Sequence, residues 1–252
     1  MQHYIVVGSS RGLGAALVTE LLRQEAAQVI GLARTKLADV PQAQQWQAAG
    51  RYRHVAIDLG APQTLPVLKA VCAEMPPVPV CVIFNAAAIQ QDVKANGALD
   101  YETVRQINRV NIDGLTQVLE AFEAHLLTYR GAVIGISSVW GVTPPLGLPW
   151  IAYPASKAYL NLFCRCLRVA WQKKVPVMTV HLGVIGGGGA STLATLAVPT
   201  YQMAAQKIVR SIAAGKGRRN LRYPLWQAAV YQCLRLLPDA LLARLFAAYG
   251  KR

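Results

Sequence analysis

The sequence predicts a single α/β domain built on a doubly wound, mostly parallel sheet with helices on both faces. Three observations lead to this fold class. Apolar β-branched runs alternate with helical patterns, a glycine-rich turn joins the first run to the first helix, and no repeat or interdomain linker interrupts the 252 residues. With 54% hydrophobic and 15% charged residues, the chain can bury a large core, which excludes global disorder.

The first half of the chain supplies four expected strands and two helices. Residues 4–7, 28–34, 52–59 and 80–85 are short apolar runs of the kind found in parallel strands that are buried on both faces. Helical patterns cover residues 15–22 and 64–74. Prolines at positions 76, 77 and 79 separate the second helix from the fourth strand.

The second half continues this alternation. A helical pattern over residues 101–125 contains Asn108 and Asn111, and because asparagine has a poor helix propensity we expect one of them to bend the helix or to carry function. Strands are expected at 132–138 and 175–182, helices at 153–171 and 200–214, and a flexible loop at 183–190. We assign residues 1–224 to the main domain and residues 225–252 to an apolar helical extension of it.

The turn after the first expected strand has glycine at positions 8, 12 and 14. Glycine permits a tight turn, and it lets backbone N–H groups at a helix N-terminus approach a pyrophosphate. The spacing is G-x-x-x-G-x-G, whereas the commoner dinucleotide pattern is G-x-G-x-x-G. Glycines also serve ordinary turns, so it is the position between a strand and a helix that favours a dinucleotide site.

The end of the second expected strand bears on the choice of cofactor. NAD-binding folds usually place an acid there to hold the ribose 2′-hydroxyl, but this chain has Ala33 and Arg34, with Lys36 beyond. Arg11 also lies inside the glycine turn. Two guanidinium groups and no carboxylate favour a 2′-phosphate, and therefore NADP, over the alternative that both arginines are ordinary surface residues. Asp58, at the end of the third strand, suits an adenine amino group.

Tyr153 and Lys157 lie four residues apart in an expected helix, which places them one turn apart on the same face. A tyrosine hydroxyl has a pKa of about 10, and a nearby positive charge favours the phenolate, so we expect Lys157 to lower this pKa. Ser138 ends the preceding strand and can present a hydroxyl to the same spot. Taken alone, such a pair is more often a solvated helix face, so the rest of the chain must decide.

Together these features resemble the short-chain dehydrogenase/reductase family from Tyr4 to about residue 225. The glycine turn, Asp58, Asn85-Ala86, Asn111, the two serines before Val-Trp-Gly, and Tyr-x-x-x-Lys occur in the family's order and spacing. The resemblance implies a single-domain Rossmann fold with a catalytic tetrad of Asn111, Ser138, Tyr153 and Lys157. It also implies cofactor contacts from Gly8, Ser10, Arg11, Gly12, Leu13, Gly14, Arg34, Asp58, Leu59, Asn85, Ala86, Ala87, Tyr153, Lys157, Gly183, Val184 and Ile185.

Four positions depart from the family pattern. The family usually has threonine where this chain has Val7, glycine at Ala87, proline at Leu182, and a nicotinamide-binding threonine at the position that Gly187 takes here. None of these changes removes a catalytic group. They bear on cofactor geometry and affinity instead.

The resemblance implies an NADP(H)-dependent oxidoreductase of the carbonyl reductase type. Hydride would pass between nicotinamide and a carbonyl or secondary alcohol, with Tyr153 as the general acid/base, Ser138 on the substrate oxygen, Lys157 on the nicotinamide ribose, and Asn111 holding a relay water. The apolar loop with Trp140, Leu146, Leu148 and Trp150 either lines a pocket for a hydrophobic or aromatic substrate or packs the core. The alternative is a catalytically weak or silent regulatory protein that binds dinucleotide.

Other function classes find less support in the sequence. No Gly-x-Ser-x-Gly elbow surrounds Ser138, which disfavours a hydrolase. The net charge of +14 attracts anions, but no zinc, helix-turn-helix or stacking motif indicates nucleic acid. The five cysteines and four histidines have no metal-like spacing, so we expect no metal, and the odd number of cysteines suits reduced thiols in the cytoplasm.

We also expect self-association as a dimer or tetramer, which the family resemblance implies, through the helices that contain Asn111 and Tyr153. Residues 225–237 and 240–249 suggest two short apolar helices joined at Pro238, each too short to span a bilayer. Such a pair must cover the substrate pocket, a subunit contact or an anionic membrane surface. The expected location is therefore cytoplasmic, with peripheral membrane contact through residues 225–252 as one alternative.

Overall fold

The computed structural model describes residues 2–48, 50–186, 198–215 and 220–249, which form one α/β unit around a seven-stranded sheet. The strands are β1 Gln2–Val7, β2 Ala27–Ala33, β3 Tyr52–Ala56, β4 Val80–Phe84, β5 Ala132–Ser138, β6 Val177–Leu182 and β7 Asn220–Tyr223. Their order is β3-β2-β1-β4-β5-β6-β7, and every pairing in the sheet is parallel. The direction of winding reverses between β1 and β4, which confirms the doubly wound fold.

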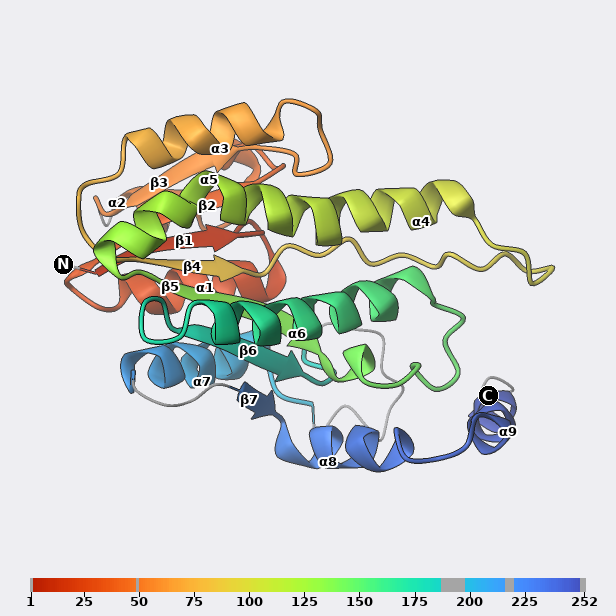
Figure 1. Ribbon diagram of the computed structural model, residues 1–252. Coiled ribbons are helices and arrows are strands. Elements are labelled where there is room, and N and C mark those ends of the chain that lie inside the picture. The colour runs from red at the N-terminus through yellow and green to blue at the C-terminus, as the bar shows by residue number, and fades with distance from the viewer. Residues whose placement is uncertain (1, 49, 187–197, 216–219, 250–252) are drawn as a thin grey trace.

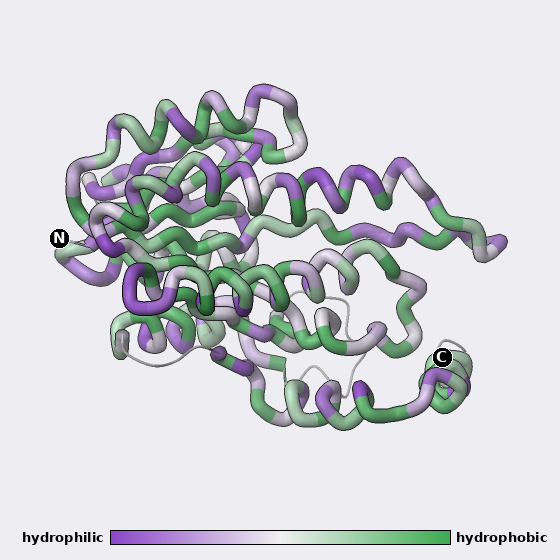
Figure 2. The backbone as a smooth tube through the Cα atoms, viewed as in Figure 1, coloured by the Kyte–Doolittle hydropathy of each residue, from purple (hydrophilic) through white to green (hydrophobic). Residues whose placement is uncertain are grey.

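Helices cover both faces of the sheet (Figure 1). Helices α1 Gly12–Leu22 and α7 Tyr201–Ala213 pack on one face, while α3 Thr64–Ala73, α5 Gly114–Tyr129 and α6 Ala152–Ala170 pack on the other. Alternate residues of β1 divide between the two cores, with Tyr4 and Val6 in the first and Ile5 and Val7 in the second. Because both faces are buried, the central strands are mostly apolar (Figure 2), as their sequences predicted.

The long helical pattern that begins at residue 101 is divided into three parts. Helix α4 spans Tyr101–Asn108, a π-helical segment η2 spans Arg109–Asp113, and α5 follows directly. Asn111 lies in the π-helical turn, where it is buried. The expectation that an asparagine would distort this helix is therefore met at Asn111, and π-bulges of this kind are frequent at functional sites.

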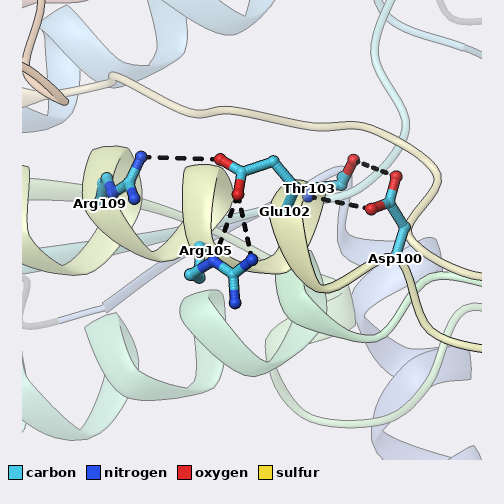
Figure 3. A network of polar contacts seen from close by, with 5 residues as sticks. All are labelled: Asp100, Glu102, Thr103, Arg105 and Arg109. Carbon is cyan, nitrogen blue, oxygen red and sulfur yellow. Dashed lines mark hydrogen bonds and ion pairs between the residues drawn. The ribbon is translucent and has the colours of Figure 1, made fainter.

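Helix α4 begins with a polar network at its exposed N-terminus (Figure 3). The Asp100 carboxylate accepts hydrogen bonds from the backbone N–H of Thr103, at 3.5 Å, and from its hydroxyl, at 2.8 Å. Glu102 pairs with Arg105 at 3.1 Å and with Arg109 at 3.8 Å. Exposed pairs of this type contribute little stability, so the capping bonds of Asp100 are the main determinant of where α4 starts.

The remaining elements are short. A 3-10 turn η1 Leu37–Asp39 and α2 Ala43–Ala48 connect β2 to β3, and a 3-10 turn η3 Val139–Gly141 follows β5. The sequence did not predict strand β7, which is only four residues long and alternates apolar with polar residues. Within the described part of the chain, the loop expected at 183–190 is represented by residues 183–186, which form no regular element.

The C-terminal extension forms two helices, α8 Leu225–Leu234 and α9 Asp239–Tyr249, as the break at Pro238 predicted. Helix α8 follows β7 along one edge of the molecule, and α9 extends away from the body (Figure 1). Among the residues that the structure describes, no helix combines the length and apolarity needed to cross a bilayer.

Candidate active site

Two adjoining pockets lie beyond the carboxyl ends of the strands. The larger, with a volume of about 650 Å³, lies over the ends of β1, β2, β3 and β4, and the smaller, of about 160 Å³, lies over β5 and β6 beside α6. Leu13, Asn85 and Ala87 line both pockets and mark where they meet. This position, at the switch point of a doubly wound sheet, is where such folds bind ligands.

The glycine turn forms the floor of the larger pocket through close backbone contacts. Gly8 has a φ of +81°, and a Cβ there would lie 2.9 Å from backbone atoms of Ala86. A Cβ on Gly14 would lie 1.8 Å from the carbonyl oxygen of Gly8, and the same oxygen accepts a hydrogen bond from the Asn85 amide at 3.2 Å. Gly14 therefore supports the turn from below rather than lining the pocket, while Gly8, Ser10, Gly12 and Leu13 line it.

The first turn of α1 has no side-chain cap, since the N-cap residue Arg11 makes no capping hydrogen bond. Its N-terminal N–H groups are thus without a side-chain partner, and a helix N-terminus in that state favours an anion. Arg11 and Arg34 both line the larger pocket, and neither forms an ion pair with a residue that the structure describes. The larger pocket therefore presents two exposed guanidinium groups, suited to phosphate.

The opposite wall of the larger pocket comes from β3 and β4. It contains the predicted residues Asp58, Leu59, Asn85, Ala86 and Ala87. The carboxylate of Asp58 accepts a hydrogen bond from the N–H of Gly60 at 3.0 Å, which fixes its direction at the end of β3. Thr35 and Tyr201 also line this pocket and were not predicted. Tyr201 comes from α7, far away in sequence, so no local pattern could have placed it there.

The smaller pocket brings Ser138, Tyr153 and Lys157 together. The Lys157 ammonium lies 5.6 Å from the centroid of the Tyr153 ring and donates a hydrogen bond to the carbonyl oxygen of Ile136 at 2.9 Å. The hydroxyl of Ser138 accepts from the N–H of Trp140 at 3.1 Å and also interacts with the Tyr153 hydroxyl. Three of the four predicted catalytic side chains thus line one small pocket.

Burial controls the protonation of both titratable groups. Burial raises the pKa of Tyr153 to about 12, and the hydrogen bond with Ser138 opposes this increase. Burial also lowers the pKa of Lys157 to about 8. The expectation that the Tyr153 pKa is lowered is therefore wrong: loss of solvation raises it, and the lowering influence comes from Ser138 rather than Lys157. The Tyr153 hydroxyl is protonated at neutral pH and has a proton to donate.

Asn111 lies next to this pocket and supports its neighbours. Its amide nitrogen donates to the carbonyl of Ala88 at 3.0 Å and to the Ser156 hydroxyl at 2.9 Å, and its amide oxygen accepts from the N–H of Ala88 at 2.7 Å. Both N–H groups of the amide are therefore committed to protein partners. The Asn111 side chain thus joins the segment after β4 to α6, where its partner Ser156 lies between Tyr153 and Lys157 in the sequence. Only the amide oxygen of Asn111 can accept a further hydrogen bond from a water.

A buried carboxylate that the sequence did not single out holds the start of α6. Asp92, with no exposed surface, accepts hydrogen bonds from the backbone N–H groups of Ile151 and Ala152. Asp92 lies seven residues beyond Asn85, in the segment after β4 whose Ala88 backbone bonds to Asn111. A negative charge at a helix N-terminus is favourable, so Asp92 fixes the helix that carries Tyr153.

The remaining predicted cofactor-binding residues lie in the segment after β6, and only some of them line a pocket. Gly183 and Ile185 line the smaller pocket, together with Leu182, one of the positions that depart from the family pattern. Val184 lines neither pocket, and its backbone N–H and carbonyl both bond to the side chain of Gln227. Its direct cofactor contact therefore remains a prediction without support from the pocket geometry. Gly187 lies outside the described residues.

Comparison with known proteins agrees with this architecture. The family model described as short chain dehydrogenase matches residues 2–194. The chain belongs to the short-chain dehydrogenase family. This confirms the resemblance drawn from the glycine turn, the paired serines and Tyr-x-x-x-Lys.

Curated relatives of this family member are oxidoreductases at modest identity. Carbonyl reductase family member 4 of Danio rerio is 27% identical over 84% of this chain and 83% of its own length. An NADPH-dependent pterin aldehyde reductase of Arabidopsis thaliana is 25% identical over 72% and 74%. The chain is also 29% identical to an uncharacterized oxidoreductase of Myxococcus xanthus over 94% and 93%.

Solved structures share the fold. A short-chain dehydrogenase of Sphingobium yanoikuyae in complex with NADPH superposes with a TM-score of 0.76 at 21% identity, over 96% of each chain. One from Burkholderia cenocepacia in complex with NADP gives a TM-score of 0.75 at 22% identity, over 97% of this chain and 99% of the other. At such identities the likeness supports the Rossmann fold of this chain.

The burial of Lys157 predicts how stability depends on pH. Its pKa is about 8 in the folded protein and about 10.4 in an unfolded chain. Between these values the unfolded state binds more protons, so the free energy of unfolding rises with pH. We expect the free energy of unfolding of the wild-type protein, minus that of Lys157→Met, to increase by roughly 1–3 kcal/mol between about pH 8 and pH 10. Urea titrations at several pH values measure it.

Taking this difference removes the contribution of the buried Cys81 thiol, whereas Cys164 and Lys157 affect each other's pKa, so the difference includes their coupling. The pKa values of both thiols are raised by burial, so their effect on stability has the opposite sign. Lys174→Met, at an exposed lysine, is the matched control and should show no such pH-dependent difference. If the difference in free energy of unfolding between the wild-type protein and Lys157→Met stays constant with pH, burial does not lower the pKa of Lys157.

Proposed function

We propose that the protein is an NADP(H)-dependent oxidoreductase of the carbonyl reductase type. The observation that carries this proposal is the union of two pockets, one lined by a glycine turn with Arg11 and Arg34, the other by Ser138, Tyr153 and Lys157. The name of one NADPH-dependent relative and the NADP complexes of two structural neighbours support the choice of cofactor, and the name of a carbonyl reductase relative supports the reaction type. The carbonyl or secondary alcohol would occupy the space next to Tyr153.

The residues of the larger pocket fit a dinucleotide phosphate. The uncapped N-terminus of α1 suits the pyrophosphate, Arg11 and Arg34 suit a ribose 2′-phosphate, and Asp58 suits the adenine amino group. Because Gly8 has no side chain, the backbone of the turn itself forms the floor of the pocket. When bound, the nicotinamide supplies or accepts the hydride of the reaction.

Proton transfer would be the task of the smaller pocket. In the reducing direction, the carbonyl carbon gains a hydride and its oxygen gains a proton, and Tyr153 is protonated at neutral pH and placed to give that proton. Ser138 can donate a hydrogen bond to the same oxygen and stabilise its developing charge. Lys157, with its pKa near 8, can resupply the proton to Tyr153, and in the oxidising direction each transfer reverses.

The aromatic side chains beside Tyr153 favour a hydrophobic or aromatic substrate. Trp140 and Trp150 lie edge-on to the Tyr153 ring, with centroids at 6.1 and 6.5 Å, and edge-on to each other at 5.4 Å. They form an apolar wall with no charged residue. The alternative of a silent regulatory protein has less support, because the departures at Val7, Ala87 and Leu182 leave every proton-handling group in place.

The mechanism predicts the effect of removing the Tyr153 hydroxyl. Tyr153→Phe should reduce turnover by roughly 10²–10⁴, as expected for loss of a general acid, and leave NADPH binding largely unchanged. Oxidation of NADPH across a panel of ketones and aldehydes, together with calorimetry, measures both. Tyr159→Phe, on the same helix, is the matched control. Full activity in Tyr153→Phe would refute the assignment, and no turnover by the wild-type protein despite NADPH binding would favour the regulatory alternative.

The arginines predict a preference for NADP over NAD. Arg34→Gln should weaken NADPH binding by about tenfold or more, since a hydrogen bond to a charged group is worth about 1.5–3 kcal/mol, and should change NADH binding little. Raising the salt concentration should weaken NADPH binding more than NADH binding. Arg210→Gln, at an exposed arginine of α7, is the control. Equal dissociation constants of the wild-type protein for NADPH and NADH would show that the predicted preference for NADP is wrong.

Self-association through α6 is a further part of the proposal. Its outward face carries Leu162, Cys166 and Val169, spaced at helical intervals, and Leu162 and Val169 are 62% and 67% exposed. Such a stripe suits contact with a second copy of the chain.

Cytoplasmic location and membrane contact through residues 225–252 remain predictions. The prediction of membrane contact is prompted by the exposed side chains of Leu225, Trp226 and Leu236.

We therefore expect Leu162→Asp to shift the protein toward the monomer in sedimentation experiments, because a charge in an apolar contact is costly. Leu236→Asp, in the C-terminal extension, should leave the assembly unchanged. The opposite pattern would place the contact in the C-terminal helices. A wild-type protein that sediments as a monomer would exclude both.

A further inference from the structure

Helix α8 turns two polar side chains toward the protein, while several of its large apolar side chains are exposed. Gln227 and Tyr231 are four residues apart and face inward together, and Gln227 is only 4% exposed. By contrast, the apolar side chains of Leu225, Trp226 and Val230 are 73%, 52% and 48% exposed. Ala228 is buried as well, but the larger apolar side chains stay exposed, so the inward hydrogen bonds of Gln227 and Tyr231 contribute to the orientation of α8.

Gln227 holds the segment after β6. Its amide oxygen accepts from the N–H of Val184 at 2.6 Å, and its amide nitrogen donates to the carbonyl of Val184 at 3.2 Å. The residues on each side, Gly183 and Ile185, line the smaller pocket. A Cβ on Gly183 would lie 2.0 Å from the Gln227 amide oxygen, so glycine at this position lets Gln227 reach the backbone.

Tyr231 holds the segment after β5. Its hydroxyl accepts a hydrogen bond from the indole N–H of Trp140 at 2.8 Å. Trp140 follows Ser138 by two residues, its backbone N–H bonds to the Ser138 hydroxyl, and its ring meets Tyr153 edge-on. One turn of α8 therefore reaches both segments that border the catalytic pocket.

We propose that Gln227 and Tyr231 are positioning residues of the active site. Gln227 sets the place of the wall formed by Gly183 and Ile185, against which the nicotinamide end of the cofactor would lie. Tyr231 sets the place of Trp140 and thus the wall on the substrate side of Tyr153. This inference rests on the proposed function, and it gives the C-terminal extension a role in assembling the catalytic pocket.

The experiment compares two ligands of different length. Adenosine 2′,5′-bisphosphate should occupy only the larger pocket, whereas NADPH should extend into the smaller one. Gln227→Leu, which removes both hydrogen bonds to Val184, should weaken NADPH binding by about tenfold and leave binding of the bisphosphate unchanged. Calorimetry on the full-length protein measures both constants. Gln232→Leu, on the same helix, is the matched control and should change neither.

Each outcome bears on one of the two proposals. NADPH binding by Gln227→Leu at the wild-type affinity overturns the role of Gln227. If Gln227→Leu binds neither ligand, its fold is damaged, and Gln227→Glu is then used because it keeps an acceptor for the N–H of Val184. Selective loss of NADPH binding by Gln227→Glu supports the role of Gln227. Equal binding changes for the two ligands, or none, overturn that role. If the wild-type protein binds neither ligand, the proposed function itself fails.

Tyr231→Phe tests the second contact, since it removes the hydroxyl and keeps the ring. We expect the KM for the carbonyl substrate to rise about fivefold or more, with the dissociation constant of NADPH unchanged, because Trp140 lies on the substrate side. A merely structural role would lower thermal stability without this split. An unchanged KM would overturn the role of Tyr231.

Discussion

The close packing of backbone on backbone at the switch point of the sheet is the constraint on which the site depends. Gly8 touches the backbone of Ala86, and Gly14 lies directly beneath the carbonyl of Gly8. Asn85 bonds to the same carbonyl from the end of β4. Any Cβ at these two glycines would separate β1 from β4 or lift α1 from the sheet. The larger pocket exists because these contacts leave the helix N-terminus and two strand ends around one space.

A second constraint is that the polar groups around Tyr153 are buried and must find partners inside the protein. Lys157 donates to the carbonyl of Ile136, Asn111 joins Ala88 to Ser156, and Asp92 accepts from the first N–H groups of α6. Leaving any one of these groups unpaired would cost on the order of 1–3 kcal/mol, and more for a charge. The network therefore fixes the position of α6 relative to the sheet and to the segment after β4. It also explains why both pKa values depart from their ordinary range, since burial removes the water that would stabilise each charge.

Of the three departures from the family pattern that the structure describes, two line a pocket. Ala87 borders both pockets and Leu182 borders the smaller one, while Val7 is buried within β1. None of these three side chains can donate or accept a proton. The contacts from α8 reach the same region, because Gln227 bonds to the residue two beyond Leu182. The wall of the smaller pocket is thus held by a helix that lies outside the matched family region, which ends at residue 194.

Much of the fold and the central part of the site followed from the sequence alone. The alternation of apolar runs with helical patterns determined the parallel sheet, because only strands buried on both faces are apolar throughout. Local spacing determined that Tyr153 and Lys157 share a helix face, and that the glycine turn lies between β1 and α1. Tertiary structure alone decided which residues from distant elements complete the site. Tyr201, Asp92, Gln227 and Tyr231 reach it across long sequence separations, through contacts that no local periodicity encodes. It also decided the sign of the Tyr153 pKa shift, since a pKa depends on how much water the fold removes as well as on which charge lies nearby.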